Sequence, residues 1–195
     1  MSLIKKLSFF GICFAFVVIA LGAWTRLVDA GLGCPDWPGC YGFVVFPTTE
    51  AEILIAEQRY PQFPYEIDKA IPEVVHRYFA AALGFIAILL VTFAFKYNLP
   101  KKIKAITSFL LLFICCQGLF GYLTVSLKLL PIIVTGHLFG GFITLSLFFY
   151  LFLSTTGGIR NHQIGHLKIL GGIALVALLI QIFLGVWTST NYASL

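Results

Sequence analysis

Apolar residues along the chain gather in five long runs that are separated by shorter polar segments. The runs cover residues 7–24, 75–95, 106–127, 132–153 and 169–187. Each is long enough to cross the hydrocarbon core of a bilayer, which takes about 20 residues in a helix. Hydrophobic residues make up 59% of the chain and charged residues 11%, more apolar surface than a soluble domain could bury. The pattern therefore predicts an all-α, polytopic transmembrane helical bundle.

Basic residues lie in short segments between these runs and so indicate orientation. Lys5 and Lys6, the lysines of residues 96–104, and Arg160 with Lys168 fall on one side if the runs alternate across the membrane. Such clusters mark the cytoplasmic side. We therefore expect a multi-pass protein of the inner (plasma) membrane with a cytoplasmic N-terminus. The formal charge of +5 does not gather on one polar face, so we expect membrane lipid and no nucleic acid as a partner.

The longest polar stretch is an external loop of residues 25–74, which carries Cys34 and Cys40. Prolines and a glycine between the two cysteines favour a tight bend that could bring the sulfurs together, and an exported compartment permits a disulfide. The pair is then either a structural staple or a redox-active pair that passes electrons toward a bound group. Residues 50–59 are predicted to form a short amphipathic helix that could lie on the membrane surface.

Two histidines lie within apolar runs at similar depth. His76 is in the first turn of the second run and His137 in the second turn of the fourth, and both turns open on the outer side. Their depths differ by roughly 7 Å at the helical rise, which a tilt could absorb. Two imidazoles at like depth in a bundle can ligate one haem iron axially. Alternatively, each histidine hydrogen-bonds a neighbouring helix.

Charged residues accompany the first histidine. Glu73 lies three residues before His76, so the two share a helical face. Glu73 is either a helix cap or a proton acceptor beside a bound ligand. Arg77 and Arg26 are natural partners for carboxylates such as haem propionates, although lone interfacial arginines can also reach lipid phosphate.

The chain contains an internal repeat. Residues 21–32 (LGAWTRLVDAGL) align with residues 184–195 (LGVWTSTNYASL) at Leu, Gly, Trp, Thr, Ala and Leu. The fifth run therefore restarts the pattern of the first. We expect a four-helix haem-binding unit at 1–154, a cytoplasmic linker at 155–168, and at 169–195 the first helix of a truncated second repeat.

These motifs resemble the haem A synthase family. The resemblance rests on the segment 21–42, with its CPDWPGC block, on EVVHR at 73–77 and on TGHL at 135–138. It implies two pseudo-symmetric four-helix halves that convert haem O to haem A, for cytochrome c oxidase, by oxidising a ring methyl to a formyl group. By this resemblance, His76 and His137 are axial ligands of the substrate haem, and Glu73 assists the chemistry by proton transfer or by stabilising a cation. Cys34 and Cys40 match a cysteine pair that can form a disulfide in part of the family.

The resemblance also implies a second half that binds haem b, which we expect to be missing from this chain. The chain is then a truncated product, the partner of a separate C-terminal half, or a homo-oligomer. Haem O synthase and cytochrome oxidase are the expected pathway partners. The alternative function is a non-catalytic haem-binding or haem-transfer assembly module, or an inactive fragment.

Overall fold

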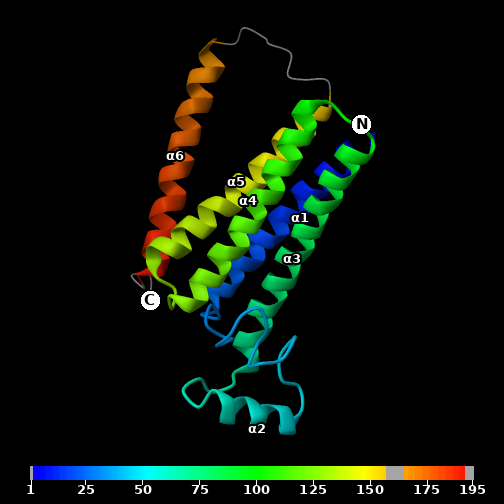
Figure 1. Ribbon diagram of the computed structural model, residues 1–195. Coiled ribbons are helices and arrows are strands. Elements are labelled where there is room, and N and C mark those ends of the chain that lie inside the picture. Colours follow the sequence, from blue (N-terminus) through cyan, green and yellow to red (C-terminus); the bar gives the residue numbers. More distant parts are fainter. Residues whose placement is uncertain (1, 157–164, 192–195) are drawn as a thin grey trace.

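The computed structural model describes residues 2–156 and 165–191, and its regular secondary structure there is entirely helical. The helices are α1 (Ser2–Leu27), α2 (Glu50–Arg59), α3 (Ile67–Lys96), α4 (Lys101–Ser126), α5 (Pro131–Thr155) and α6 (Gly165–Thr190), arranged as Figure 1 shows. All except α2 are long and apolar enough to cross a membrane. The predicted polytopic helical bundle is confirmed.

Helices α1, α3, α4 and α5 form a four-helix bundle. Helix α1 packs against α3 and α5, and α4 packs against the same two helices. Helices α3 and α5 are therefore diagonal to each other, and α1 and α4 form the other diagonal. Side chains from α3 and α5 can thus meet only across the centre of the bundle.

The two ends of the bundle differ in their packing. The large buried apolar side chains lie toward the end where α1 begins, which we call the N-terminal end, and they include Ile4, Leu90, Leu110 and Phe148. At the opposite end, which we call the loop end, residues 28–66 pack into a small cluster around Cys34 and Cys40. The large apolar core therefore occupies the N-terminal end of the bundle, and the loop end has a separate, smaller cluster.

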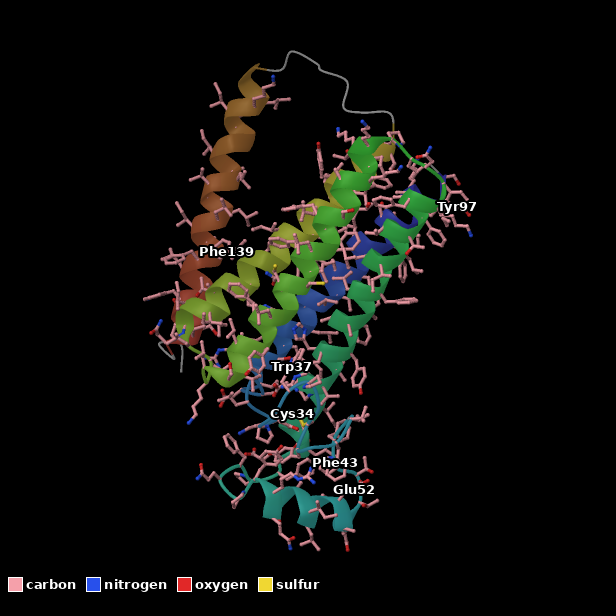
Figure 2. All side chains as sticks on the ribbon, viewed as in Figure 1. Cys34, Trp37, Phe43, Glu52, Tyr97 and Phe139 are labelled. Atoms are coloured by element: carbon pink, nitrogen blue, oxygen red, sulfur yellow. A yellow bond between two sulfur atoms is a disulfide. The ribbon has the colours of Figure 1, made fainter. Side chains whose placement is uncertain are left out.

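The loop end is itself folded rather than irregular. Helix α2 spans residues 50–59, as the sequence predicted, and begins with a capping box in which Thr49 and Glu52 exchange side-chain to backbone hydrogen bonds. Figure 2 shows Cys34, Phe43 and Glu52 at this end of the molecule. Helix α3 begins at Ile67, earlier than predicted. Pro72 is therefore the sixth residue of the helix and not its start, and it removes one backbone hydrogen bond to the preceding turn.

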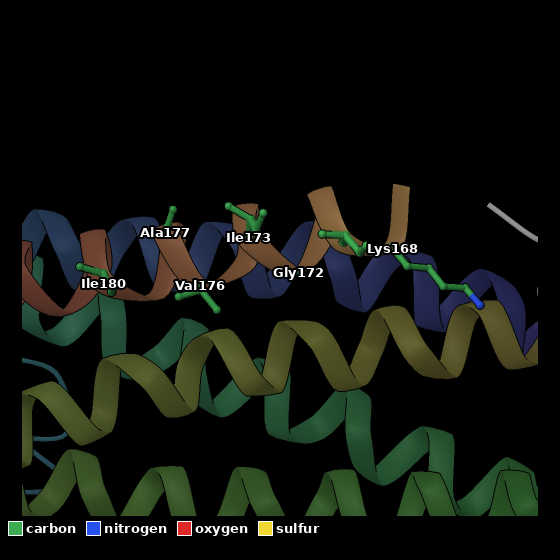
Figure 3. Close-up of a pocket in the computed structure, with 7 residues that line it drawn as sticks. Lys168, Gly172, Ile173, Val176, Ala177 and Ile180 are labelled. Carbon is green, nitrogen blue, oxygen red and sulfur yellow. The ribbon is translucent and has the colours of Figure 1, made fainter. Parts of the chain in front are cut away.

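Helix α6 stands apart from the bundle for most of its length (Figure 1). Its buried residues, Val186 and Thr190, lie near its C-terminal end, where it contacts α5. Arg26 at the end of α1 donates a hydrogen bond to the backbone carbonyl of Ser189. A shallow hollow along α6 is lined by residues of this helix alone (Figure 3), namely Lys168, Ile169, Gly172, Ile173, Val176, Ala177 and Ile180. Most of the predicted linker, residues 157–164, lies outside the described residues.

Candidate functional site

The two histidines predicted to share a ligand lie opposite each other. His76 projects from α3 and His137 from α5, and the centres of their rings are 6.4 Å apart with the ring planes at 89°. Because α3 and α5 are diagonal, the imidazoles meet across the interior of the bundle. The structure therefore brings together two residues that are 61 positions apart in the sequence.

Glycines on the two flanking helices leave room for these rings. A Cβ atom at Gly22 on α1 would lie 2.9 Å from Cε1 of His76, closer than normal packing allows. A Cβ atom at Gly121 on α4 would lie 3.6 Å from Cε1 of His137, an ordinary contact. Helix α1 can thus approach His76 only because position 22 carries no side chain.

The spacing of the rings suits a metal ion held between them. With metal–imidazole bonds of about 2 Å, two imidazoles on one metal have ring centres roughly 6 Å apart. Nδ1 of each ring is buried without a hydrogen-bond partner among the described residues. The His76 ring has one other polar neighbour, the backbone of Val18 on α1, with which it makes a hydrogen-bonding contact. Within the described part of the chain, no group of three or more His, Cys, Asp or Glu residues gathers. The pair therefore fits a metal that brings its own equatorial ligands, as haem iron does.

The disulfide expected from the sequence is present and lies beside this site. Cys34 and Cys40 are bonded, which closes a ring of residues 34–40 that we call the disulfide loop. The backbone N–H of Cys34 donates to Oε2 of Glu73 at 2.9 Å. Glu73 belongs to α3 and is only 4% exposed, so this hydrogen bond fixes the loop to the helical turn before His76.

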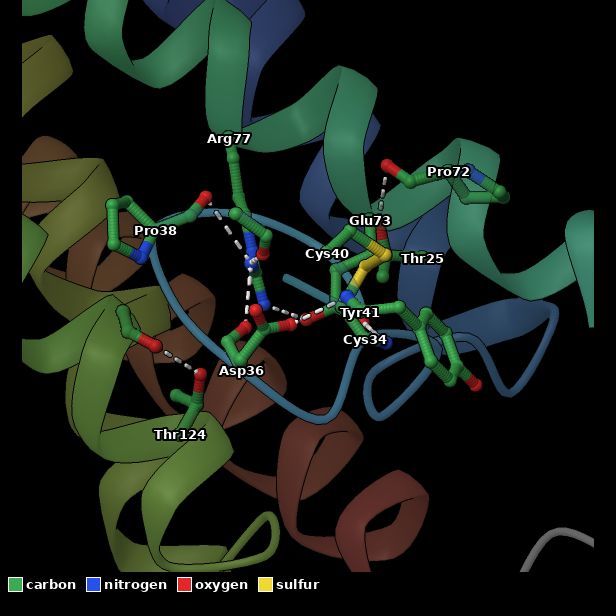
Figure 4. Close-up of polar contacts among 12 residues, drawn as sticks. Thr25, Cys34, Asp36, Pro38, Cys40, Tyr41, Pro72, Glu73, Arg77 and Thr124 are labelled. Atoms are coloured by element: carbon green, nitrogen blue, oxygen red, sulfur yellow. Dashed lines mark hydrogen bonds and ion pairs between the residues drawn. A yellow bond between two sulfur atoms is a disulfide. The ribbon is translucent and has the colours of Figure 1, made fainter. Parts of the chain in front are cut away.

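Arg77 makes the second attachment of the disulfide loop (Figure 4). Its guanidinium pairs with Oε1 of Glu73 and donates to the backbone carbonyls of Asp36 at 2.9 Å and Gly39 at 2.6 Å. Glu73 and Arg77 thus form one buried ion pair that holds both sides of the loop. His76 lies between them in sequence, so loop and ligand site share one turn of α3.

Within the loop, Asp36 organises the turn that follows. Its carboxylate accepts hydrogen bonds from the backbone N–H groups of Tyr41 at 2.6 Å and Gly42 at 2.7 Å. Both residues have positive φ. Gly42, at +80°, adopts this conformation without strain because glycine has no side chain. The Tyr41 hydroxyl donates to the carbonyl of Pro64, and burial raises the pKa of Tyr41 to about 12, so it remains a donor. Sequence reasoning did not single out Asp36 or Tyr41, although aspartate near glycine is a turn signal.

The loop also reaches α4. The ring of Trp37 meets that of Tyr122 edge-on, with centroids 5.9 Å apart. Tyr122 is adjacent to Gly121, which faces His137. The disulfide loop is thus attached to α3 on one side of the histidine pair and touches α4 on the other.

Arg26 has other partners. It forms an ion pair with Asp29 at 3.3 Å, in addition to its hydrogen bond to Ser189 on α6. The expected contacts of Arg26 and Arg77 with propionates stay predictions. Both guanidiniums are already bonded within the chain, and Arg77 joins the proposed ligand site to the loop in a way that its position in the sequence did not reveal.

Comparison with known proteins agrees with the resemblance described from the motifs. Residues 5–195 match the family described as cytochrome oxidase assembly protein (COX15-CtaA). A curated protein of Shewanella oneidensis named heme A synthase is 42% identical over 186 residues, which cover 93% of this chain and 56% of that protein. This chain therefore spans about half the length of that relative. No solved structure matches it. The chain belongs to the cytochrome oxidase assembly protein family that includes haem A synthase.

Proposed function

We propose that this chain is the substrate-binding half of a membrane oxidoreductase that converts haem O to haem A for cytochrome c oxidase. The observation that carries the proposal is the pair of facing imidazoles, His76 and His137, whose centres are 6.4 Å apart inside the bundle. Membership of the family and the heme A synthase of Shewanella oneidensis support the same reaction. Haem iron supplies the electron and oxygen chemistry that oxidation of a methyl group requires.

The residues around the pair have separate roles in this proposal. The two histidines hold the iron and so fix the plane of the substrate. Glu73, one turn before His76, receives a proton from the substrate side, and its hydrogen bond from Cys34 keeps its carboxylate in place. Arg77 has five N–H donors, so it can bind loop carbonyls and Glu73 and still offer donors to a propionate. Arg26 is the second proposed propionate contact.

The disulfide has a structural role in this proposal. Because the N–H of Cys34 binds the buried Glu73 directly, a closed disulfide loop keeps that carboxylate in position. We therefore favour the staple over electron transfer through the two sulfurs.

The organisation of the chain is proposed on the same basis. Residues 1–154 are the substrate unit, and 169–195 belong to a second repeat, of which α6 is the first helix and whose remainder binds haem b. Haem O synthase and cytochrome oxidase are the proposed pathway partners. Lys5, Lys6 and the lysines of residues 96–104 lie at the N-terminal end of the bundle, which supports a cytoplasmic N-terminus in the inner membrane.

The test is mass spectrometry of haem extracted from the chain after expression in a host that supplies haem O. Expression is done with and without the C-terminal half of the Shewanella oneidensis relative. We expect bound haem O with the chain alone and haem A when both halves are present. Haem that stays unmodified in both cases would instead indicate a haem-transfer module.

Variants at the site sharpen this experiment. His76→Ala and His137→Ala should each lose bound haem or change its spectrum, whereas Ser146→Ala, on an exposed face of α5, should not. Unchanged haem content in both histidine variants would show that the axial pair is wrong. Glu73→Gln should retain haem but suppress product, and normal product from this variant would remove Glu73 from the mechanism.

A further inference from the structure

An amide group lies beside the histidine pair that neither the motifs nor the proposed reaction accounts for. Gln117 is on α4, within a membrane-spanning helix, and is partly buried. Its side-chain amide lies against Gly140 on α5, where a Cβ atom would overlap it. The amide makes no hydrogen bond to another described residue. An unsatisfied amide inside a membrane span is costly, so it calls for a partner.

The position of this amide relative to the rings follows from the two helices. Gly121, which faces His137, is one turn from Gln117 on α4, and Gly140 is three residues beyond His137 on α5. At the helical rise, the amide therefore lies about 5 Å from the ring pair along the bundle axis, toward the N-terminal end. The disulfide loop and Arg77 lie on the opposite side of the pair, at the loop end.

This arrangement orients a haem between the rings. Propionates are drawn to the polar loop end, where the arginines are, so the opposite edge of the macrocycle faces the apolar half of the bundle and Gln117. Haem O differs from protohaem on that opposite edge, because a hydroxyl-bearing farnesyl chain replaces a vinyl group. A hydroxyl both donates and accepts a hydrogen bond, and so does a glutamine amide.

We propose that Gln117 is a specificity-determining residue that binds the alcohol group on the deep edge of the substrate and so selects haem O over protohaem. The inference rests on the proposed function, since it requires a haem between His76 and His137. Gly140 has a supporting role, because any larger residue there would push the amide away from α5. Sites that hydrogen-bond a substrate hydroxyl reject the analogue that lacks it, because their own polar group is then left unpaired.

The experiment measures equilibrium dissociation constants of haem O and protohaem for the purified chain by absorbance titration. The variants are Gln117→Met, which nearly keeps the length of the side chain and removes the hydrogen bonds, and Gly140→Ala, which displaces the amide. Thr107→Val is the matched control, because the Thr107 hydroxyl is on the same helix and bonds only the carbonyls of its own preceding turn.

We expect the preference for haem O to fall about tenfold in both test variants, the size of one hydrogen bond in a buried site. Protohaem affinity and the control should stay unchanged. An unchanged preference, or an equal weakening of both haems, would overturn the inference and leave Gln117 as a contact between helices. If the wild-type chain binds neither haem, the proposed function fails and this inference fails with it. Binding of both haems without any effect of the variants refutes the role of Gln117 alone.

Discussion

Replacing Arg77 with methionine tests how strongly the disulfide loop is held to the ligand site. The Arg77 and Glu73 side chains are 13% and 6% exposed, so their ion pair is largely removed from solvent. Methionine keeps most of the apolar length of the side chain but removes the ion pair and the hydrogen bonds to the carbonyls of Asp36 and Gly39. Glu73 is then left as a buried charge with the Cys34 N–H as its remaining partner.

The free-energy cost of the Arg77→Met substitution follows from the loss of this ion pair. Removing one partner of a buried ion pair costs about 3–5 kcal/mol, and the lower end applies because the Cys34 hydrogen bond remains. A loss of about 3 kcal/mol corresponds to roughly a 100-fold increase in the open population of the loop. Glu73→Gln alone should cost less, because the amide oxygen can still accept from Cys34. In the double variant no unpaired charge remains, so its cost should be clearly smaller than the sum of the two single costs.

Hydrogen–deuterium exchange of a peptide covering residues 33–42 measures this opening directly. Arg77→Met should accelerate exchange of its protected amides about 100-fold, and Lys102→Met, at the N-terminal end of the bundle, should have no effect. Exchange within twofold of the wild type in Arg77→Met would refute the reasoning. Additive effects of the single variants would show that Glu73 and Arg77 are not coupled.

Two further predictions concern the packing of the site and of the loop. Gly22→Ala should displace His76, which should destabilise the fold by about 1–3 kcal/mol and weaken haem binding, whereas Gly121→Ala should be tolerated at its ordinary contact distance. Equal haem affinities of the two variants would contradict this. Between pH 10 and about 12, folded Tyr41 keeps a proton that the unfolded chain releases, so stability should fall as pH rises through this window. Thermal unfolding in detergent should show a shallower fall for Tyr41→Phe, and identical slopes would refute the assignment.

The helices were predictable because apolar positions define them, in long runs or at helical spacing. All five spans were found from hydropathy, and α2 was found with its observed bounds from the amphipathic pattern of residues 50–59. The ends of the long helices were less well predicted. Helix α3 extends eight residues before the predicted run because polar residues such as Asp68 continue the helix beyond the apolar segment.

The candidate site was predictable only in part. The histidines stood out because polar residues are rare in membrane spans, and their similar depth could be counted from the helix starts. The contact of Glu73 with Cys34 could not be found in this way, because it joins residues 39 positions apart through a turn whose course depends on the folded loop. Gln117 was overlooked for the same reason: its position beside Gly140 depends on how α4 and α5 pack.

The diagonal placement of α3 and α5 has a consequence for heat stability. These two helices are held in the bundle through α1 and α4, so a ligand bound to both His76 and His137 would add a direct cross-link between them. Such a ligand binds the folded chain and not the unfolded one, and at a free concentration 100 times its dissociation constant it stabilises folding by about 2.7 kcal/mol. The melting temperature of the purified protein should therefore rise with the free haem concentration, and it should continue to rise after the site is saturated.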